Sequence, residues 1–137
     1  MVSIKYKAGN NLNLDQFIEL YITSTFGERR PVHNREVMKA MLENADLIVT
    51  AWDGAKLVGI TRTLTDFSNV AYLADLAVHL DYQKKGIGKE LIKRIRAALK
   101  PTCSIVLISA PKANEYYPKI GFMHNPRAWT LDPIEKP

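Results

Sequence analysis

Two glycines and three lysines stand together in residues 82–92 (YQKKGIGKELI), where an apolar run gives way to an amphipathic one. The spacing predicts that a helix begins here, and a helix N-terminus leaves backbone N–H groups unpaired and carries roughly half a positive charge. Glycines at such a turn let a bulky anion reach the backbone, because no Cβ stands in the way. Further donors and positive charge come from Gln83, Lys84, Lys85 and Lys89. The combination favours binding of a pyrophosphate.

The two familiar glycine-rich phosphate motifs fit this turn less well. A P-loop would need a glycine where Gln83 stands and Ser or Thr where Glu90 stands, and a dinucleotide-binding turn would need a third glycine at Leu91. Short glycine patterns are weak indicators, and a tight strand-to-helix turn with solvated lysines explains the same residues. The turn by itself leaves both interpretations open.

Asp75 is the only carboxylate in the apolar run of residues 70–80. Burying an unpaired charge is costly, so the carboxylate needs a function or a partner. It can accept a proton during catalysis, directly or through water, or it can pair with a buried donor such as Arg62 and be purely structural. Strict strand alternation predicts that Asp75 faces opposite to Tyr72, Ala74 and Leu76.

The composition predicts one cytoplasmic domain over residues 1–137. Hydrophobic residues make up 47% of the chain, enough for a core, and no run is long enough to span a membrane. The first residues do not resemble a signal peptide, and a single cysteine, Cys103, agrees with a reducing compartment. The histidines have no ligand-like spacing, so no metal site is expected. A net charge of +5 suits an anionic ligand without choosing among nucleotide, nucleic acid and membrane.

The elements that must position these residues alternate between strand and helix. We expect a strand over residues 3–8, then two helices capped by Asn13 and Asn34, with Gly27 ending the first. A hairpin around Asp53-Gly54 joins residues 47–52 to residues 57–65. These features predict a mixed α/β fold.

The second half of the chain contains a strand–helix–strand unit. Residues 70–80 read as a buried strand, residues 86–99 as a helix and residues 103–109 as a second apolar strand, so the two strands should be parallel. Residues 113–119 predict a short helix that Pro118 strains in its last turn. Residues 121–131 predict one or two short strands, with Trp129 packed in the core or a groove.

Two segments of the sequence resemble a known family. Residues 78–88 (VHLDYQKKGIG) resemble the acyl-CoA motif of the GNAT (GCN5-related) N-acetyltransferases, Gln/Arg-x-x-Gly-x-Gly/Ala after a strand that ends in Val. Residues 116–122 (YYPKIGF) resemble the family's "FYEKLGF" segment. The order of elements agrees over residues 3–131, so the resemblance covers nearly the whole chain.

The resemblance implies the GNAT fold, a central mixed sheet flanked by helices, in which the fourth and fifth strands splay apart around the co-substrate acetyl-CoA. The pantetheine arm would bond to the backbone of the fourth strand, and the pyrophosphate would lie on the turn. The residues implied in binding are Leu76, Ala77, Val78, Gln83, Lys84, Lys85, Gly86, Ile87, Gly88, Lys89 and Tyr116.

The reaction implied is direct attack of a primary amine on the thioester in a ternary complex. Tyr117 matches the family's catalytic tyrosine and would protonate the leaving thiolate, helped by a lowered pKa or by late proton transfer, since a phenol titrates near 10 and a thiol near 8.5. The backbone N–H of Leu76 or Val78 would stabilise the oxyanion. The family's glutamate base falls at about Tyr72, which cannot take that role at neutral pH. Asp75 is the alternative proton acceptor, and a water chain is another.

Other functions compatible with the sequence are a CoA-binding sensor without turnover and, less well supported, a basic nucleic-acid-binding module. The sensor is suggested by the missing glutamate. The basic module is suggested by the cluster of lysines and arginines on residues 84–100, but interleaved aromatics for base stacking are missing there. A homodimer is possible if a partner completes the last strand. The amine acceptor is not encoded in any motif that we recognise.

Overall fold

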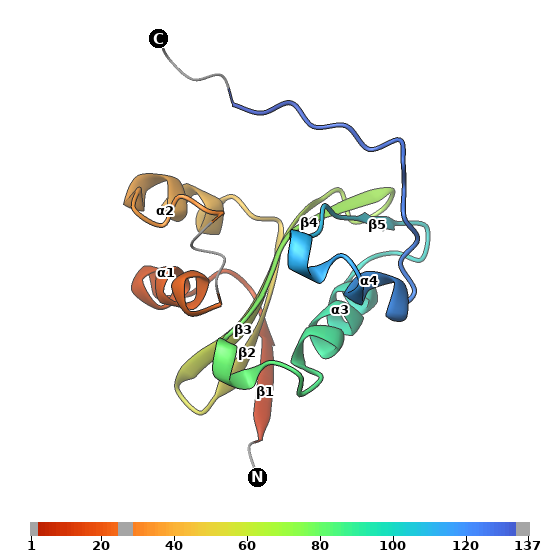
Figure 1. The fold of residues 1–137 in the computed structure, drawn as a ribbon. Helices are drawn as coiled ribbons and strands as arrows, with labels where there is room; N and C mark the ends of the chain where they lie inside the picture. The colour runs from red at the N-terminus through yellow and green to blue at the C-terminus, as the bar shows by residue number, and fades with distance from the viewer. Residues whose placement is uncertain (1–2, 25–28, 134–137) are drawn as a thin grey trace.

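The computed structural model describes residues 3–24 and 29–133. A five-stranded sheet crosses the molecule in the order β1-β2-β3-β4-β5 (Figure 1). Its strands are β1 (Ile4–Ala8), β2 (Leu47–Asp53), β3 (Lys56–Thr65), β4 (Val70–Val78) and β5 (Ser104–Val106). Neighbouring strands pair antiparallel except β4 and β5, which are parallel. The mixed sheet and the parallel pair are confirmed.

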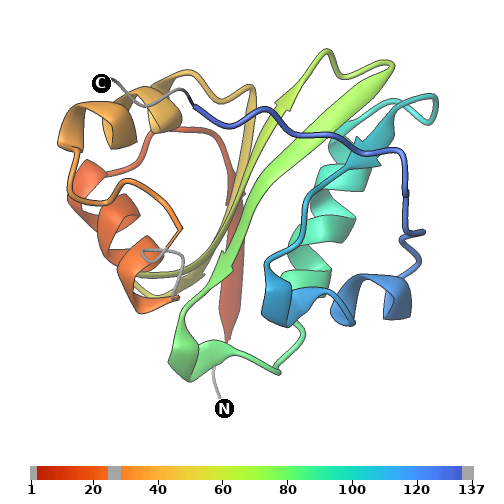
Figure 2. The same ribbon diagram turned by 45° about the horizontal axis from the view of Figure 1, so that its top comes forward.

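Helices cover both faces of this sheet (Figure 2): α1 (Leu14–Thr23) and α2 (Arg35–Glu43) lie on one side and α3 (Ile87–Ala98) on the other. Both predicted asparagine caps are present. Asn13 Oδ1 accepts from the N–H of Gln16 at 3.0 Å, and Asn34 Oδ1 accepts from the N–H of Val37 at 3.2 Å. The predicted end of the first helix at Gly27 lies outside the described residues.

A hydrophobic core lies on each face of the sheet. On the α3 face it consists of Val49, Ala51, Val58, Ala71, Leu73, Ile87, Leu91, Ile95, Leu99 and Cys103. On the α1–α2 face it consists of Phe17, Leu20, Tyr21, Met38, Leu42, Ile48, Leu57, Ile60 and Ala77. Because the sheet is covered on both faces, β4 is apolar on both of its sides, as its sequence predicted.

A β-bulge interrupts β4 at Ala74. The register pairs Asp75 with Arg62 but Leu73 with Thr63, so Ala74 is the extra residue on its strand. The strict alternation expected for this strand is therefore wrong.

The bulge decides which side chains share a face. Leu76 packs against the α3 core, as Leu73 does before the bulge. Asp75 contacts Tyr21 of α1 on the opposite face. Tyr72 alternates with Leu73, so it lies on the same face as Asp75 rather than the opposite one.

The strands β4 and β5 separate soon after they meet. Pairing between them is limited to Val70–Tyr72 of β4 and Ser104–Val106 of β5. The bulge at Ala74 follows shortly afterwards along β4. The fifth strand is therefore shorter than the predicted residues 103–109, because β4 no longer offers it a partner. The fourth strand ends at Val78, and a 3-10 turn, η2 (Leu80–Tyr82), takes the last residues expected in it.

The chain after β5 differs most from the prediction. A 3-10 turn, η3 (Pro111–Ala113), precedes a helix α4 of only four residues (Tyr116–Lys119). Pro118 lies in the first turn of α4, where a backbone N–H has no helical partner, so the expected strain is absent.

Residues 121–131 form no strand, although one or two were predicted there. Trp129, which we expected to pack, is 91% exposed. The Asn125-Pro126 pair interrupts the segment, and a proline cannot donate to a strand ladder.

Candidate active site

The glycine–lysine turn joins β4 to α3 through η2. Lys84 has φ 62° and Gly86 has φ 81°, so two left-handed residues reverse the chain within three positions. A Cβ added at Gly86 would meet nothing within 4 Å, so glycine is required there by conformation rather than by space. The turn therefore presents an open backbone surface in front of α3.

Gly86 is also the N-cap of α3, and it has no side chain with which to cap the helix. The first helical bond runs from the N–H of Glu90 to the carbonyl of Gly86 at 3.1 Å. The N–H groups of Ile87, Gly88 and Lys89 precede that bond and have no helical acceptor. This arrangement suits an anion, and binding of the pyrophosphate at these N–H groups stays a prediction.

The lysines of the turn differ in their surroundings. Lys85 Nζ lies 5.4 Å from the centroid of the Tyr82 ring, and Lys56 Nζ lies 5.2 Å from the same centroid. The Tyr82 hydroxyl donates to Asp53 in the β2–β3 hairpin. Tyr82 therefore fixes η2 to the hairpin and holds Lys85 beside it. All three lysines, Lys84, Lys85 and Lys89, are exposed.

The backbone of β4 points into the gap toward β5 at the positions expected to bind pantetheine. The N–H of His79 donates to Val58 of β3 at 2.8 Å, and alternation then directs the N–H groups of Leu76 and Val78 away from β3. The Val78 carbonyl, on the same side, accepts from the Gln83 amide at 2.9 Å. Ala77 has the reverse orientation, with its side chain buried on the α1–α2 face.

The two sequence motifs meet at Gly88. A Cβ at this position would lie 3.3 Å from the Tyr116 hydroxyl and 3.9 Å from Cδ2 of Leu76. The start of α3, the start of α4 and the gap-facing part of β4 therefore come together at one point. Nothing in the local sequence placed Tyr116 against Gly88.

Tyr117 lies next to this point and is half-buried. Its ring packs edge-on against Tyr116, with centroids 5.3 Å apart, and against Phe122 at 5.4 Å. Gly121, with φ 100°, ends α4 and folds Phe122 back, so that the Phe122 N–H donates to the Tyr117 carbonyl at 3.1 Å. Burial raises the pKa of Tyr117 above 10.0, with a smaller contribution from Tyr116, while Arg29 opposes the rise. The expectation that the pKa of Tyr117 is lowered is therefore wrong, and late proton transfer to the thiolate is the expected route that is left.

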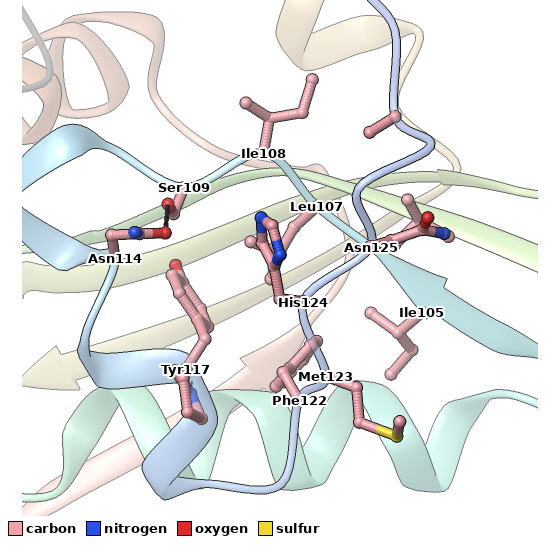
Figure 3. Close-up of a pocket in the computed structure, with 13 residues that line it drawn as sticks. Ile105, Leu107, Ile108, Ser109, Asn114, Tyr117, Phe122, Met123, His124 and Asn125 are labelled. Atoms are coloured by element: carbon pink, nitrogen blue, oxygen red, sulfur yellow. Dashed lines mark hydrogen bonds between the residues drawn. The ribbon is translucent and has the colours of Figure 1, made fainter.

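Tyr117 also lines a cavity of about 440 Å³ between β5 and the chain that follows α4 (Figure 3). Its ring points toward Ser109 and Asn114, which bond to each other through Ser109 Oγ and Asn114 Oδ1 at 3.1 Å. The lining is Ile105, Val106, Leu107, Ile108, Ser109, Asn114, Tyr117, Pro118, Phe122, Met123, His124, Asn125 and Ala128. None of the described residues that line it is a lysine or an arginine.

Asp75 lies in a buried polar network on the α1–α2 face. Its side chain is 0% exposed and forms ion pairs with Arg62 at 2.6 Å and Arg30 at 2.7 Å. The Tyr21 hydroxyl donates to Oδ2 at 2.6 Å. The predicted pairing with Arg62 is confirmed. In this conformation an amine cannot contact the carboxylate, which favours the structural interpretation of Asp75.

Sequence reasoning missed two members of this network, Arg30 and Tyr21. Burial and the neighbouring Asp75 hold the pKa of Tyr21 well above 10.0. No local pattern in the sequence indicates either contact.

Two negative observations apply to the part of the chain that the structure describes. No three His, Cys, Asp or Glu side chains gather there as a group able to hold a metal ion. Within the same residues, no helix combines the length and the apolar character that crossing a membrane requires.

Comparison with known proteins agrees with the fold and with the family that the sequence resembles. A family model described as "Acetyltransferase (GNAT) domain" matches residues 18–128. The uncharacterized N-acetyltransferase ycf52 of Pyropia yezoensis is 30% identical over 131 residues, which cover 90% of this chain and 72% of that protein.

Solved structures show the same fold. A GNAT family acetyltransferase of Streptococcus pneumoniae, SP0256, has a TM-score of 0.77 at 24% identity, over 98% of this chain and all of the other. The aminoglycoside N-acetyltransferase AAC(6')-Iy in complex with CoA has a TM-score of 0.72 at 14% identity, over 97% and 96% of the two chains. With the family model matched over most of its length, the chain belongs to the GNAT family of acetyltransferases.

Proposed function

We propose that this protein transfers the acetyl group of acetyl-CoA to a primary amine by direct attack in a ternary complex. The observation that carries the proposal is the convergence at Gly88, where the uncapped start of α3, Tyr116 and Leu76 of β4 lie together. A pyrophosphate on the N–H groups of α3 would be continuous with a pantetheine arm along β4. The residues proposed for these contacts are Leu76, Ala77, Val78, Gln83, Lys84, Lys85, Gly86, Ile87, Gly88, Lys89 and Tyr116.

In the proposed reaction the nitrogen of a neutral amine attacks the thioester carbon. The N–H of Leu76 or Val78 donates to the oxyanion, and collapse of the intermediate breaks the C–S bond. Tyr117 gives its proton to the departing thiolate. The proton lost by the amine returns through water to the phenolate, so that the tyrosine is restored.

Burial of Tyr117 suits this role only in one respect. A raised pKa keeps the phenol protonated at neutral pH, which an acid requires. The phenol is, however, a weaker acid than a thiol, so the proton must move late, as the C–S bond breaks and the amine proton becomes available.

The proton acceptor for the amine is proposed to be water. Both oxygens of Asp75 are engaged by Arg30, Arg62 and Tyr21. Tyr72 stands where the family's glutamate base falls, and it offers no carboxylate there. A cytoplasmic location, one domain over the whole chain and the absence of a nucleic-acid partner remain part of the proposal, and a homodimer remains possible.

Binding is tested first, by thermal denaturation with acetyl-CoA. A ligand at 100 times its dissociation constant stabilises the folded state by about 2.7 kcal/mol. If acetyl-CoA at millimolar concentration does not raise the melting temperature while an oligonucleotide does, the nucleic-acid interpretation replaces this one.

Turnover is tested next, against a broad panel of amines with thiol release as the readout. The Tyr117→Phe variant keeps the ring and its packing, and we expect turnover to fall about 10²–10⁴-fold with acetyl-CoA affinity unchanged. Tyr6→Phe, which removes a phenol from β1, is the control. Binding without turnover of any amine would favour the sensor function, and full activity in Tyr117→Phe would reduce Tyr117 to a packing residue.

A further inference from the structure

Arg30, in the connection between α1 and α2, reaches across to the fourth strand. Its Nε donates to Oδ1 of Asp75 at 2.7 Å, and its Nη2 donates to the carbonyl of Ala74 at 3.0 Å. Its side chain is 21% exposed, whereas that of Asp75 is fully buried. One guanidinium therefore binds two successive residues of β4.

The second of these contacts falls on the β-bulge. Ala74 is the residue that has no partner in the β3–β4 register, and only 8% of it is exposed. A buried carbonyl without a donor is unfavourable, so the bulge needs a group that reaches it from outside the ladder. Arg30 supplies that donor.

The first contact ties the bulge to the rest of the α1–α2 face. The other oxygen of Asp75 accepts from Tyr21 of α1 and from Arg62 of β3. The bulge is therefore held from three elements, and Arg30 is the only one of these groups that binds both Asp75 and the Ala74 carbonyl among the described contacts.

The position of the bulge sets the direction of the backbone beyond it. Pairing between β4 and β5 ends at Tyr72, two residues before the bulged Ala74, and Leu76 and Val78 then point their N–H groups into the gap. Without the bulge, the alternation along β4 would shift by one residue and turn Leu76 to the opposite face.

We propose that Arg30 is a positioning residue for acetyl transfer: by clamping the bulge at Ala74 and Asp75, it aims the N–H groups of Leu76 and Val78 at the thioester. The inference rests on the proposed function. It also connects the segment between α1 and α2 to the strand that is proposed to bind the co-substrate.

The test compares Arg30→Ala and Arg30→Lys with Arg35→Ala. Arg35 forms an ion pair with Asp15 at 2.6 Å, but both side chains are exposed, so its loss removes an arginine without touching β4. We expect Arg30→Ala to lower kcat about 10- to 100-fold, because misplaced donors lose transition-state stabilisation, with a smaller rise in the acetyl-CoA dissociation constant. Arg35→Ala should match the wild type.

Two further readouts separate positioning from loss of structure. Added guanidinium should restore part of the kcat of Arg30→Ala, and the amide resonances of Leu76 and Val78 should shift in that variant and return with guanidinium. If Arg30→Ala does not fold, Arg30→Lys carries the same measurements, since a lysine keeps the charge but cannot make both contacts in the same geometry.

Unchanged kcat together with unchanged Leu76 and Val78 resonances in a folded Arg30 variant would overturn the inference. Failure of the proposed function looks different. In that case the wild type neither binds nor turns over acetyl-CoA, while the amide resonances still report whether Arg30 sets the backbone of β4.

Discussion

The assignment of the phosphate site to the turn predicts that Gly88→Ala weakens acetyl-CoA binding without harming the fold. Gly88 is the second residue of α3, and alanine is a better helix former than glycine by up to about 1 kcal/mol. The added Cβ would approach the Tyr116 hydroxyl at 3.3 Å, which is the end of a side chain and needs to move only slightly. We therefore expect the free energy of unfolding to change by no more than about 1 kcal/mol.

The effect on binding should be larger than the effect on stability. The methyl group would occupy the space between α3, Tyr116 and Leu76, where the co-substrate is proposed to approach the backbone. Losing one hydrogen bond to a charged group costs about 1.5–3 kcal/mol, which corresponds to an acetyl-CoA dissociation constant about 10- to 150-fold higher. Gly88→Val should raise the dissociation constant further.

Calorimetric titration with acetyl-CoA measures this directly, and Gly54→Ala is the matched control. Gly54 lies in the β2–β3 hairpin with φ 58°, so alanine there should cost about 1–2 kcal/mol of stability and leave affinity unchanged. Gly88→Ala should therefore change affinity more than stability, and Gly54→Ala should change stability but not affinity. A folded Gly88→Ala protein with a dissociation constant within about twofold of the wild type would refute the placement of the phosphates on α3.

Two other predictions concern the turn and the buried network. Lys84→Ala should weaken acetyl-CoA binding less than about fivefold, because an exposed lysine contributes about 1 kcal/mol or less; a larger loss by calorimetry would make Lys84 a direct and desolvated phosphate contact. Burial raises the pKa of Tyr21 well above 10.0 in the folded state, so its contribution to stability is complete below pH 10 and is lost as pH rises above 10. Urea denaturation from pH 8 to pH 11 should show a steeper loss for the wild type than for Tyr21→Phe, by up to about 1.4 kcal/mol per pH unit, and equal slopes would contradict the burial of this phenol.

The parts of the fold that the sequence predicted are those encoded by neighbouring residues. The caps at Asn13 and Asn34 satisfy N–H groups three residues away, and Asp53-Gly54 fixes its hairpin by its own backbone preference. The strand–helix–strand unit from β4 to β5 follows from periodicity and from the handedness of such connections. The turn before α3 was found for the same reason, since its glycines and lysines are contiguous.

The features that escaped prediction depend on contacts between distant residues. Arg30 contacts Asp75 although 45 positions of sequence separate them. The bulge at Ala74 is likewise not marked by a glycine or any other local signal in the sequence. The same limit explains the tail. Residues 128–131 have strand-forming side chains, but a strand also needs a free edge to pair with, and composition does not say whether one is available.

The identity of the proton acceptor leads to a prediction about pH. With Asp75 enclosed by Arg30, Arg62 and Tyr21, and with no carboxylate at Tyr72, the proposed mechanism contains no side chain that removes the amine proton. Only acceptor amine that is already neutral then reacts. Below the pKa of that amine, kcat/KM should therefore rise about tenfold per pH unit, and above it kcat/KM should level off.

Tyr117 should not limit the rate in that range, because its pKa is raised above 10.0 and the phenol stays protonated. The measurement uses two acceptor amines from the panel whose pKa values differ by at least about one unit, each assayed from pH 6 to pH 9.5. If water accepts the proton, the midpoint of the profile moves with the amine. A midpoint that stays at the same pH for both amines belongs to the enzyme, and it would show that a side chain acts as the base after all.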